Sequence, residues 1–501
     1  MLPRSERSRK QLNTIMPMNF NQKAGKSLIW SALDNMALRG LSFIVILLMT
    51  RLLTPEDFGL IGILQIIILL GNSIIDGGFG QSLIRDEHSN DVDFSTVFFL
   101  TFIIGICLFG IVFLTADFVA SYFGNPMLDD LLKVYALIFI ISPFSIIQNT
   151  KLMKEMNFKR VFFLNAPGSV LGGIIGISMA YQGYGVWSII GLHVSSHLFK
   201  SIFIWFGSPW KPQLVFSMKK LKYHFNFGSK IIISGVLGTI FRELYIIVIA
   251  KSFSVMSLGY YTRAKTYSLL PMSISSDAIS KAIYPILSRL KHDSKKISSS
   301  YQSIIRATFF ILTPLMLTLS ATAAPLFKFL FTEKWLPAVP YFRILTLSSI
   351  LYPIHELNIT IFKIYGKTGL FLRLNLIKQS LVILAVIIGL FSSLNGLLWA
   401  MVAISYVALL INTYYSDKMI SYGTFSQLKD MSKTLVSSIT SALLAFLCLN
   451  EYLSNQHLLI QIGLTSLISL ASYFLISVIT RNKGLSDFLL FTKIIQQSLR
   501  A

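Results

Sequence analysis

The chain has 501 residues, of which 54% are hydrophobic and only 13% are charged, and its mean hydropathy is +0.66. No soluble domain of this length tolerates such a balance, so the composition predicts an all-α polytopic membrane protein. The formal net charge of +22 would suggest nucleic acid on a soluble protein. Here we interpret it as an orientation signal carried by membrane loops, and we expect no nucleic-acid partner.

Residues 1–26 are basic and contain no apolar core before Ser27, which predicts a cytoplasmic N-terminal segment rather than a cleavable signal peptide. Cys107 and Cys448 lie in apolar runs. We expect them to be core or lipid-facing residues, not parts of a disulfide or a metal site. The sequence suggests no cofactor.

A bilayer core requires about 20 apolar residues per helix, and the chain offers about fourteen such stretches. In chain order they cover approximately residues 27–49, 58–79, 94–116, 130–150, 161–181, 184–206, 227–250, 259–287, 303–325, 338–362, 370–391, 395–416, 434–450 and 457–480. The stretch that begins near Gly259 is the least apolar of them.

Lysine and arginine are unevenly distributed over the loops between these spans. With both termini placed in the cytoplasm, most basic residues fall on the cytoplasmic side, as the positive-inside rule predicts for an even number of spans. The opposite side receives only Arg51, Lys133, Lys251, Lys328, Lys334 and Arg343.

Two stretches look like copies of one module. LMTRLLTPEDFGL at 48–60 and VIAKSFSVMSLGY at 248–260 each end one apolar span, pass through a basic residue and a polar turn, and open the next span near a glycine. A second pair, Pro143 with Asn165 and Pro353 with Asn375, repeats at equal spacing, and Gln148 corresponds to Asn358. Two related membrane halves around a central cavity are the usual plan of a transporter.

The duplication divides the chain into segments. We expect a cytoplasmic N-terminal segment at 1–26 and an N-lobe of six helices at 27–206. A cytoplasmic loop at 207–226 would lead to a pseudo-symmetric C-lobe of six helices at 227–416. The remainder, 417–501, would contain two further helices and a cytoplasmic C-terminal tail.

Charged residues inside membrane spans are costly and usually face a cavity. Here they concentrate in the first, second, seventh and eighth spans, where the two halves would meet. Arginines at such a place could hold an anion, because the guanidinium fork matches phosphate and carboxylate oxygens. The alternative is that arginines and acids pair and fix the packing. The charged residues are Asp34, Arg39, Asp76, Arg242, Glu243, Arg263, Lys265 and Asp277.

Other polar features are weaker candidates. His193 and His197 share a helix face without a nearby acid or cysteine, which favours interhelical hydrogen bonds over a metal site. His355 and Glu356 are a possible proton-coupling pair, with interhelical bonding as the alternative. The glycine repeat at 168, 172 and 176 predicts a close-packed helix face. No nucleotide-binding glycine loop or nucleophile–base pair appears in the sequence.

Several motifs carry a family resemblance. WSALDN at 30–35, RLLTPEDFGL at 51–60, DGGFG at 76–80, LGYYTRA at 258–264 and YPILSR at 284–289 resemble the Wzx-type polysaccharide-export flippases. This branch belongs to the superfamily of multidrug, oligosaccharidyl-lipid and polysaccharide exporters. The resemblance extends over about residues 24–420. It implies a transporter, not an enzyme, that moves undecaprenyl-diphosphate-linked oligosaccharide across a bacterial cytoplasmic (inner) membrane by alternating access.

The resemblance also suggests roles. We expect Arg39 and Arg242 to receive the diphosphate, with Arg263 on its path. Hydrogen bonds and stacking to sugar would come from Asn35, Tyr260, Tyr267 and Ser275. Coupling to a proton or sodium gradient would fall to Asp34, Asp76, Glu243 or Asp277. We expect a monomer in the lipid bilayer, which could contact a polysaccharide polymerase and a chain-length regulator.

Three alternatives remain open from the sequence. A drug or ion antiporter of the same superfamily would need a smaller and more acidic cavity. A membrane glycan polymerase or ligase would need a sizeable outer loop with clustered catalytic residues, and the outer loops here are short. A flippase for the lipid-linked peptidoglycan precursor fits the motifs less well.

Overall fold

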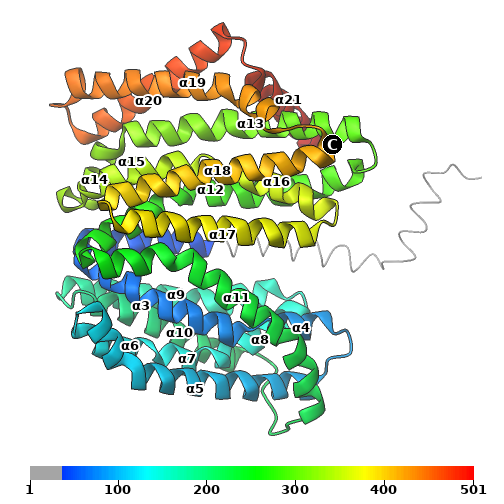
Figure 1. The fold of residues 1–501 in the computed structure, drawn as a ribbon. Helices are drawn as coiled ribbons and strands as arrows, with labels where there is room; N and C mark the ends of the chain where they lie inside the picture. Colours follow the sequence, from blue (N-terminus) through cyan, green and yellow to red (C-terminus); the bar gives the residue numbers. More distant parts are fainter. Residues whose placement is uncertain (1–36, 501) are drawn as a thin grey trace, which may run out of the picture. The chain divides into compact units, whose positions relative to one another are not determined.

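The computed structural model describes the backbone of residues 37–500, and the side chains of these residues except 274, 276–282, 368 and 494–500. Every regular element in this part is helical, which confirms the all-α class. The chain divides at Lys251 and Ser252 into two compact units. We describe each unit by itself (Figure 1).

The first unit begins with a helix through residues 37–52. The long helices that follow lie roughly side by side (Figure 1). In order the unit contains α3 (Pro55–Asp76), α4 (Phe79–Arg85), α5 (Asp91–Phe123), α6 (Met127–Tyr135), α7 (Leu137–Ile141), α8 (Pro143–Lys154), α9 (Phe158–Tyr181), α10 (Trp187–Gly207) and α11 (Met218–Ser252).

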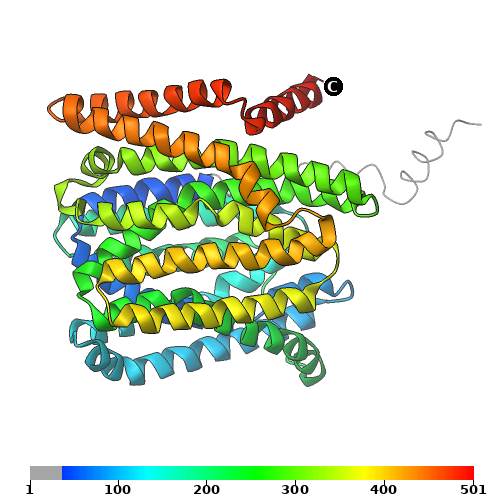
Figure 2. The same cartoon turned by 45° about the horizontal axis from the view of Figure 1, so that its top comes forward.

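The second unit has the same style of packing, and its consecutive helices α17 and α18 run side by side (yellow and gold in Figure 2). It contains α12 (Val255–Leu290), α13 (Ser294–Ala321), α14 (Ala323–Phe331), the 3-10 turn η1 (Glu333–Trp335), α15 (Ala338–Ser349), α16 (Tyr352–Ile364), α17 (Thr368–Leu390), α18 (Leu394–Ile420), α19 (Thr424–Cys448), the π-helical turn η2 (Leu449–Leu453), α20 (Leu458–Ile479) and α21 (Lys483–Arg500).

Twelve helices or helix pairs within residues 37–500 are long and apolar enough to cross a membrane. Two expected spans are not among them. The first, 27–49, lies partly outside the described residues. The eighth coincides with α12, a helix of 36 residues whose serines, threonines and charged groups lower its hydropathy. The expected number of fourteen is therefore approximate, and the multi-pass membrane architecture is confirmed.

The duplicated motif adopts the same local structure in both copies. Thr54 caps α3 and Ser254 caps α12, each accepting a hydrogen bond from a backbone N–H three residues later. At Thr54 the bond is reciprocal, because the Asp57 carboxylate accepts from the Thr54 backbone N–H at 2.8 Å. A capped turn satisfies the orphan donors of a helix start, so both copies open a new helix at the same point.

The second repeated pair also occupies equivalent positions. Pro143 begins α8 and Pro353 lies in the first turn of α16, where the missing N–H of proline is harmless. Gln148 and Asn358 are both fully buried in these helices. The repeat in the sequence therefore corresponds to a repeat in the structure.

The glycine repeat on α9 is a close-packed face, as predicted. A Cβ on Gly172 would lie 2.6 Å from the Ser196 Cβ and 2.8 Å from the Leu192 carbonyl oxygen. Gly168 and Gly176 meet α10 equally closely, at Lys200 and Leu192. Small residues let the backbones of membrane helices approach, and α9 and α10 use this stripe to pair.

By its contacts, helix α11 belongs to the first unit. The Gly228 Cα faces α4 so closely that a Cβ there would lie 2.5 Å from the Phe79 ring and 2.8 Å from the Gly77 carbonyl oxygen. The division by contacts therefore falls after α11, not in the 207–226 loop. The assignment of helices to two functional lobes stays a prediction.

Candidate functional site

The predicted cavity residues of the first unit come from three helices. Asp34 and Asn35 lie outside the described residues. Arg39 is exposed on the helix through 37–52, and Arg242 is exposed on α11. Glu243, the next residue, is 8% exposed. These two neighbouring charges thus lie on different faces of α11, with Arg242 outward and Glu243 inward.

Helices α3 and α11 run antiparallel past each other. The hydroxyls of Ser73 and Thr239 are 3.1 Å apart, and further along α3 Gly78 meets Ile231. Asp76 lies one turn beyond this contact in one direction and Arg242 one turn beyond it in the other. At 1.5 Å per residue they are about 9 Å apart along the helix axes. Asp76 is therefore not placed as the direct partner of Arg242.

Asp76 ends α3 at a sharp backbone turn. Gly77 and Gly78 have φ values of +37° and +68°, in the left-handed region that favours glycine. This turn stops α3 and starts α4, so the exposed Asp76 side chain sits at a helix end rather than within a continuous helix.

The predicted residues of the second unit line α12. Tyr260 meets Trp335 edge to face at 6.0 Å, and Tyr267 stacks on Phe331 at 4.6 Å. Half-buried Arg263 interacts with Tyr267, one turn away. These contacts give Tyr260 and Tyr267 an aromatic packing role beside any contact with sugar.

Two further predicted residues lie later on α12. The Ser275 hydroxyl donates to the Pro271 carbonyl oxygen at 2.8 Å. Pro271 lies inside α12, and as a proline it has no backbone N–H to donate to the helix. The Ser275 hydroxyl is thus engaged locally. The Asp277 side chain lies outside the described ones.

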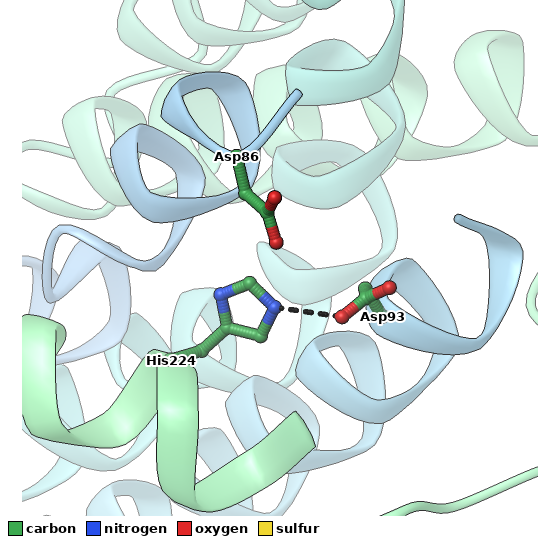
Figure 3. Close-up of side chains that lie close together, drawn as sticks. All are labelled: Asp86, Asp93 and His224. Atoms are coloured by element: carbon green, nitrogen blue, oxygen red, sulfur yellow. Dashed lines mark hydrogen bonds and ion pairs between the residues drawn. The ribbon is translucent and has the colours of Figure 1, made fainter. Parts of the chain in front are cut away.

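A buried network that the sequence did not predict joins α4, α5 and α11 (Figure 3). His224 and Asp93 are both fully buried, and the His224 Nε2 lies 3.1 Å from the Asp93 Oδ1. The His224 Nδ1 lies 2.8 Å from the Ser82 hydroxyl. Lys220 donates to the other oxygen of Asp93 at 3.0 Å. We call Ser82, Asp93, Lys220 and His224 the His224 clasp.

Asp93 has a second task in the clasp. It is the third residue of α5 and accepts from the Asn90 backbone N–H at 2.9 Å, which completes a capping box. One carboxylate therefore starts α5 and holds the beginning of α11. The burial of its charge is offset by hydrogen bonds to both oxygens.

The same place resembles a metal site in outline. Asp86, Asp93 and His224 each offer one ligand atom within 4.8 Å of the others, and the Asp86 carboxylate points toward the imidazole in Figure 3. Both ring nitrogens of His224 already have partners, and Lys220 supplies positive charge to Asp93. The geometry is that of a hydrogen-bonded clasp, in which the Lys220 ammonium supplies the positive charge that a metal ion would supply.

Another polar cluster joins α13, α19 and α21 of the second unit. The Arg306 guanidinium donates to Asp487 at 2.6 Å and to Asp430 at 3.1 Å. The Tyr422 hydroxyl donates to Asp430 at 2.9 Å. Burial, together with the nearby Asp430 carboxylate, raises the pKa of Tyr422, so this hydroxyl remains a donor at physiological pH. The cluster fastens α21 to the unit.

Lys378 is a cation within a span that sequence reasoning did not single out. It is half-buried on α17 and donates to Asn412 of α18 at 3.4 Å. The signal available in the sequence was the place of a cation about two and a half turns inside α17.

Comparison with known proteins places the chain in a family. A family model described as polysaccharide biosynthesis protein matches residues 48–340. The chain is 22% identical over 375 residues to the lipopolysaccharide biosynthesis protein WzxC of Escherichia coli (strain K12), covering 74% of this chain and 76% of WzxC. It is 24% identical over 320 residues to the succinoglycan biosynthesis transport protein ExoT of Rhizobium meliloti (strain 1021), covering 64% and 65%. It is 22% identical over 454 residues to the teichuronic acid biosynthesis protein TuaB of Bacillus subtilis (strain 168), covering 88% and 92%.

Two solved structures share the fold. The lipid II flippase MurJ in an inward closed conformation matches with a TM-score of 0.70 and 18% identity, covering 91% of this chain and 99% of MurJ. An inward-facing multidrug resistance transporter of the MATE family matches with a TM-score of 0.59 and 18% identity, covering 79% and 98%. At this identity the likeness concerns the fold alone.

Proposed function

Because the chain belongs to the polysaccharide biosynthesis protein family, a family of transporters rather than enzymes, we propose that it flips a lipid-linked oligosaccharide across a bacterial cytoplasmic membrane. The substrate class is a polyprenyl diphosphate, undecaprenyl diphosphate in bacteria, that carries a polysaccharide repeat unit. The observation that carries the proposal is the family match over residues 48–340, which spans the described charged residues from Asp76 to Arg263. The names of WzxC, ExoT and TuaB support a role in surface polysaccharide biosynthesis.

The physical task explains the distribution of charge. A glycan with a diphosphate cannot enter hydrocarbon without large desolvation costs. The protein shelters this head in a polar path while the polyprenyl tail stays in lipid. Exposed Arg39 and Arg242 receive the diphosphate, and Arg263 lies on its path. Asn35, Tyr260, Tyr267 and Ser275 contact the sugars.

Movement of the head requires alternating access and a source of energy. Asp34, Asp76, Glu243 and Asp277 are the acidic candidates for coupling to an ion gradient. The N- and C-termini lie in the cytoplasm, as the bias of basic residues predicts. The chain works as a monomer that delivers repeat units to a polymerase and a chain-length regulator.

A deletion strain tests this function. In cells that lack the gene, the lipid-linked glycan pool is measured by mass, and its leaflet is probed from outside the membrane. We expect repeat units to accumulate on the cytoplasmic side and surface polysaccharide to be lost. Units that reach the outer leaflet normally but stay unpolymerised would indicate an enzyme or assembly factor and overturn the proposal.

A further inference from the structure

Three polar side chains from three consecutive helices meet inside the second unit, and none of them is among the residues to which substrate binding is assigned. Lys378 of α17 donates from Nζ to the Oδ1 of Asn412 on α18 at 3.4 Å. The Asn412 Nδ2 lies 3.2 Å from Nδ1 of His355 on α16, and the His355 Nε2 lies 3.3 Å from the Ser405 hydroxyl. Asn412 is fully buried, while His355 and Lys378 are half-buried.

The three residues lie at the same depth. Each is about 12–14 Å from the end of its span that is marked by Ile364, Gly369 and Ile420. A permanent charge at this depth requires a specific partner. Asn412 provides one to Lys378, and the Glu356 carboxylate of α16 acts on the same ammonium. Among the described residues, the charged groups that act on His355 and Lys378 come from α16 and α17 alone.

The donors and acceptors define one protonation state. An ammonium has only donors, so Asn412 must turn its carbonyl oxygen toward Lys378 and its NH₂ toward His355. The His355 Nδ1 therefore accepts a hydrogen bond and carries no proton. Its Nε2 carries the single ring proton and donates to Ser405. These contacts fit a neutral imidazole beside a charged lysine.

A proton on the His355 Nδ1 reverses these requirements. Nδ1–H then donates, and the Asn412 amide must turn over to offer its oxygen to His355. The NH₂ of Asn412 then faces Lys378, which can accept a hydrogen bond only as a neutral amine. With the amide turned over, the charged ammonium keeps only the Glu356 carboxylate as a partner, so a proton gained by His355 disfavours the charged form of Lys378.

We propose that His355, Asn412 and Lys378 form a proton-binding relay, in which the Asn412 amide is a two-position switch and protons on His355 and Lys378 exclude each other. The relay lies across α16, α17 and α18, so each state favours a different contact between these helices. Its use in driving transport rests on the proposed function. The proton binding itself does not.

Nitrogen NMR of histidine-labelled protein in lipid nanodiscs tests the relay without transport. The His355 signals are identified by their loss in His355→Gln. We expect a neutral ring with the proton on Nε2 near neutral pH. In Lys378→Met, the titration midpoint of His355 should rise by about one pH unit, a tenfold gain in proton affinity. An unchanged midpoint would overturn the coupling.

A double-mutant cycle separates the amide switch from simple charge repulsion. In an Asn412→Leu background the switch is absent, so Lys378→Met should shift the His355 midpoint by clearly less than in the wild-type background. Equal shifts in both backgrounds would contradict the switch. If the leucine variant does not fold, Asn412→Asp replaces it in the cycle. A carboxylate at this position accepts hydrogen bonds from both His355 and Lys378, so their protons no longer exclude each other. Lys378→Arg is the matched control that keeps the charge.

Transport provides the second readout. In the His355→Gln variant, glycan export should continue at the rate seen without a pH gradient. A pH gradient, which should speed export by the wild-type protein, should no longer speed it. Unchanged acceleration would remove the relay from the transport cycle. If the wild-type protein moves no glycan at all, the proposed function fails while the NMR result stands by itself.

Discussion

Asp93 shows how one buried carboxylate can serve two helices. It caps the start of α5 and binds His224 and Lys220 of α11, so its removal strips partners from a fully buried imidazole. We predict that Asp93→Ala lowers the free energy of unfolding by about 1–3 kcal/mol. Thermal unfolding in detergent measures this loss. Glu87→Ala, at an exposed position of the preceding loop, is the control and should change little. Equal stability of both variants would show that the clasp contributes nothing.

In the proposed function, Arg39 and Arg242 bind the diphosphate of the substrate. Both are exposed, Arg39 on the helix through 37–52 and Arg242 on α11, and a guanidinium can bind phosphate oxygens in pairs. We predict that Arg39→Ala and Arg242→Ala each lose complementation of a deletion strain at normal protein level, and that lysine at either position restores it only in part. Arg373→Ala, an exposed arginine of α17, should complement fully. Full activity of both alanine variants would remove the arginines from the substrate path.

At single residues, sequence reasoning found chemical types but not partners. Asp76 and Arg242 were both recognised as polar residues within spans, yet the antiparallel pass of α3 and α11 carries them apart. His224 was not recognised, because its partner Asp93 is 131 residues away in the chain. Such a contact follows from the packing of α11 against α5, which no local pattern encodes.

Among the elements, the spans were the most predictable, because hydropathy over about 20 residues is a local property. The helix starts at Thr54 and Ser254 were also visible as repeated polar turns. The grouping of α11 with the first unit was not, because it depends on glycines at 77, 78 and 228 that let helices meet. Lys378 was not singled out for a related reason: its partner Asn412 lies on another helix.

The α9–α10 pair gives a direct test of glycine packing. A side chain on Gly172 would overlap Ser196 and the Leu192 backbone, whereas a Cβ on Gly110 would have no neighbour within 4 Å. We predict that Gly172→Val lowers the unfolding free energy by about 1–3 kcal/mol through overpacking. Gly110→Ala should be neutral or slightly stabilising, since helical glycine is conformationally costly. The comparison is made by thermal unfolding in one detergent, and a tolerant Gly172 would argue against the tight pairing.

For the whole molecule, the bias of basic residues predicts the orientation in the membrane. In a background with Cys107 and Cys448 replaced by alanine, a cysteine at Asn455 should react with a membrane-impermeant maleimide added to intact cells. A cysteine at His292 should react only after the membrane is opened. The opposite pattern would invert the topology and with it the direction of transport.

The central claim is that the chain moves a lipid-linked glycan between leaflets. The most direct measurement uses purified protein in liposomes that contain a polyprenyl-diphosphate oligosaccharide in both leaflets, with a membrane-impermeant glycosidase added outside. Without protein, roughly half of the glycan should be cleaved, because a diphosphate head does not cross hydrocarbon unaided. With the protein, the account predicts cleavage of nearly all of it. Cleavage that stays at the protein-free level, with folded protein present, would contradict the account.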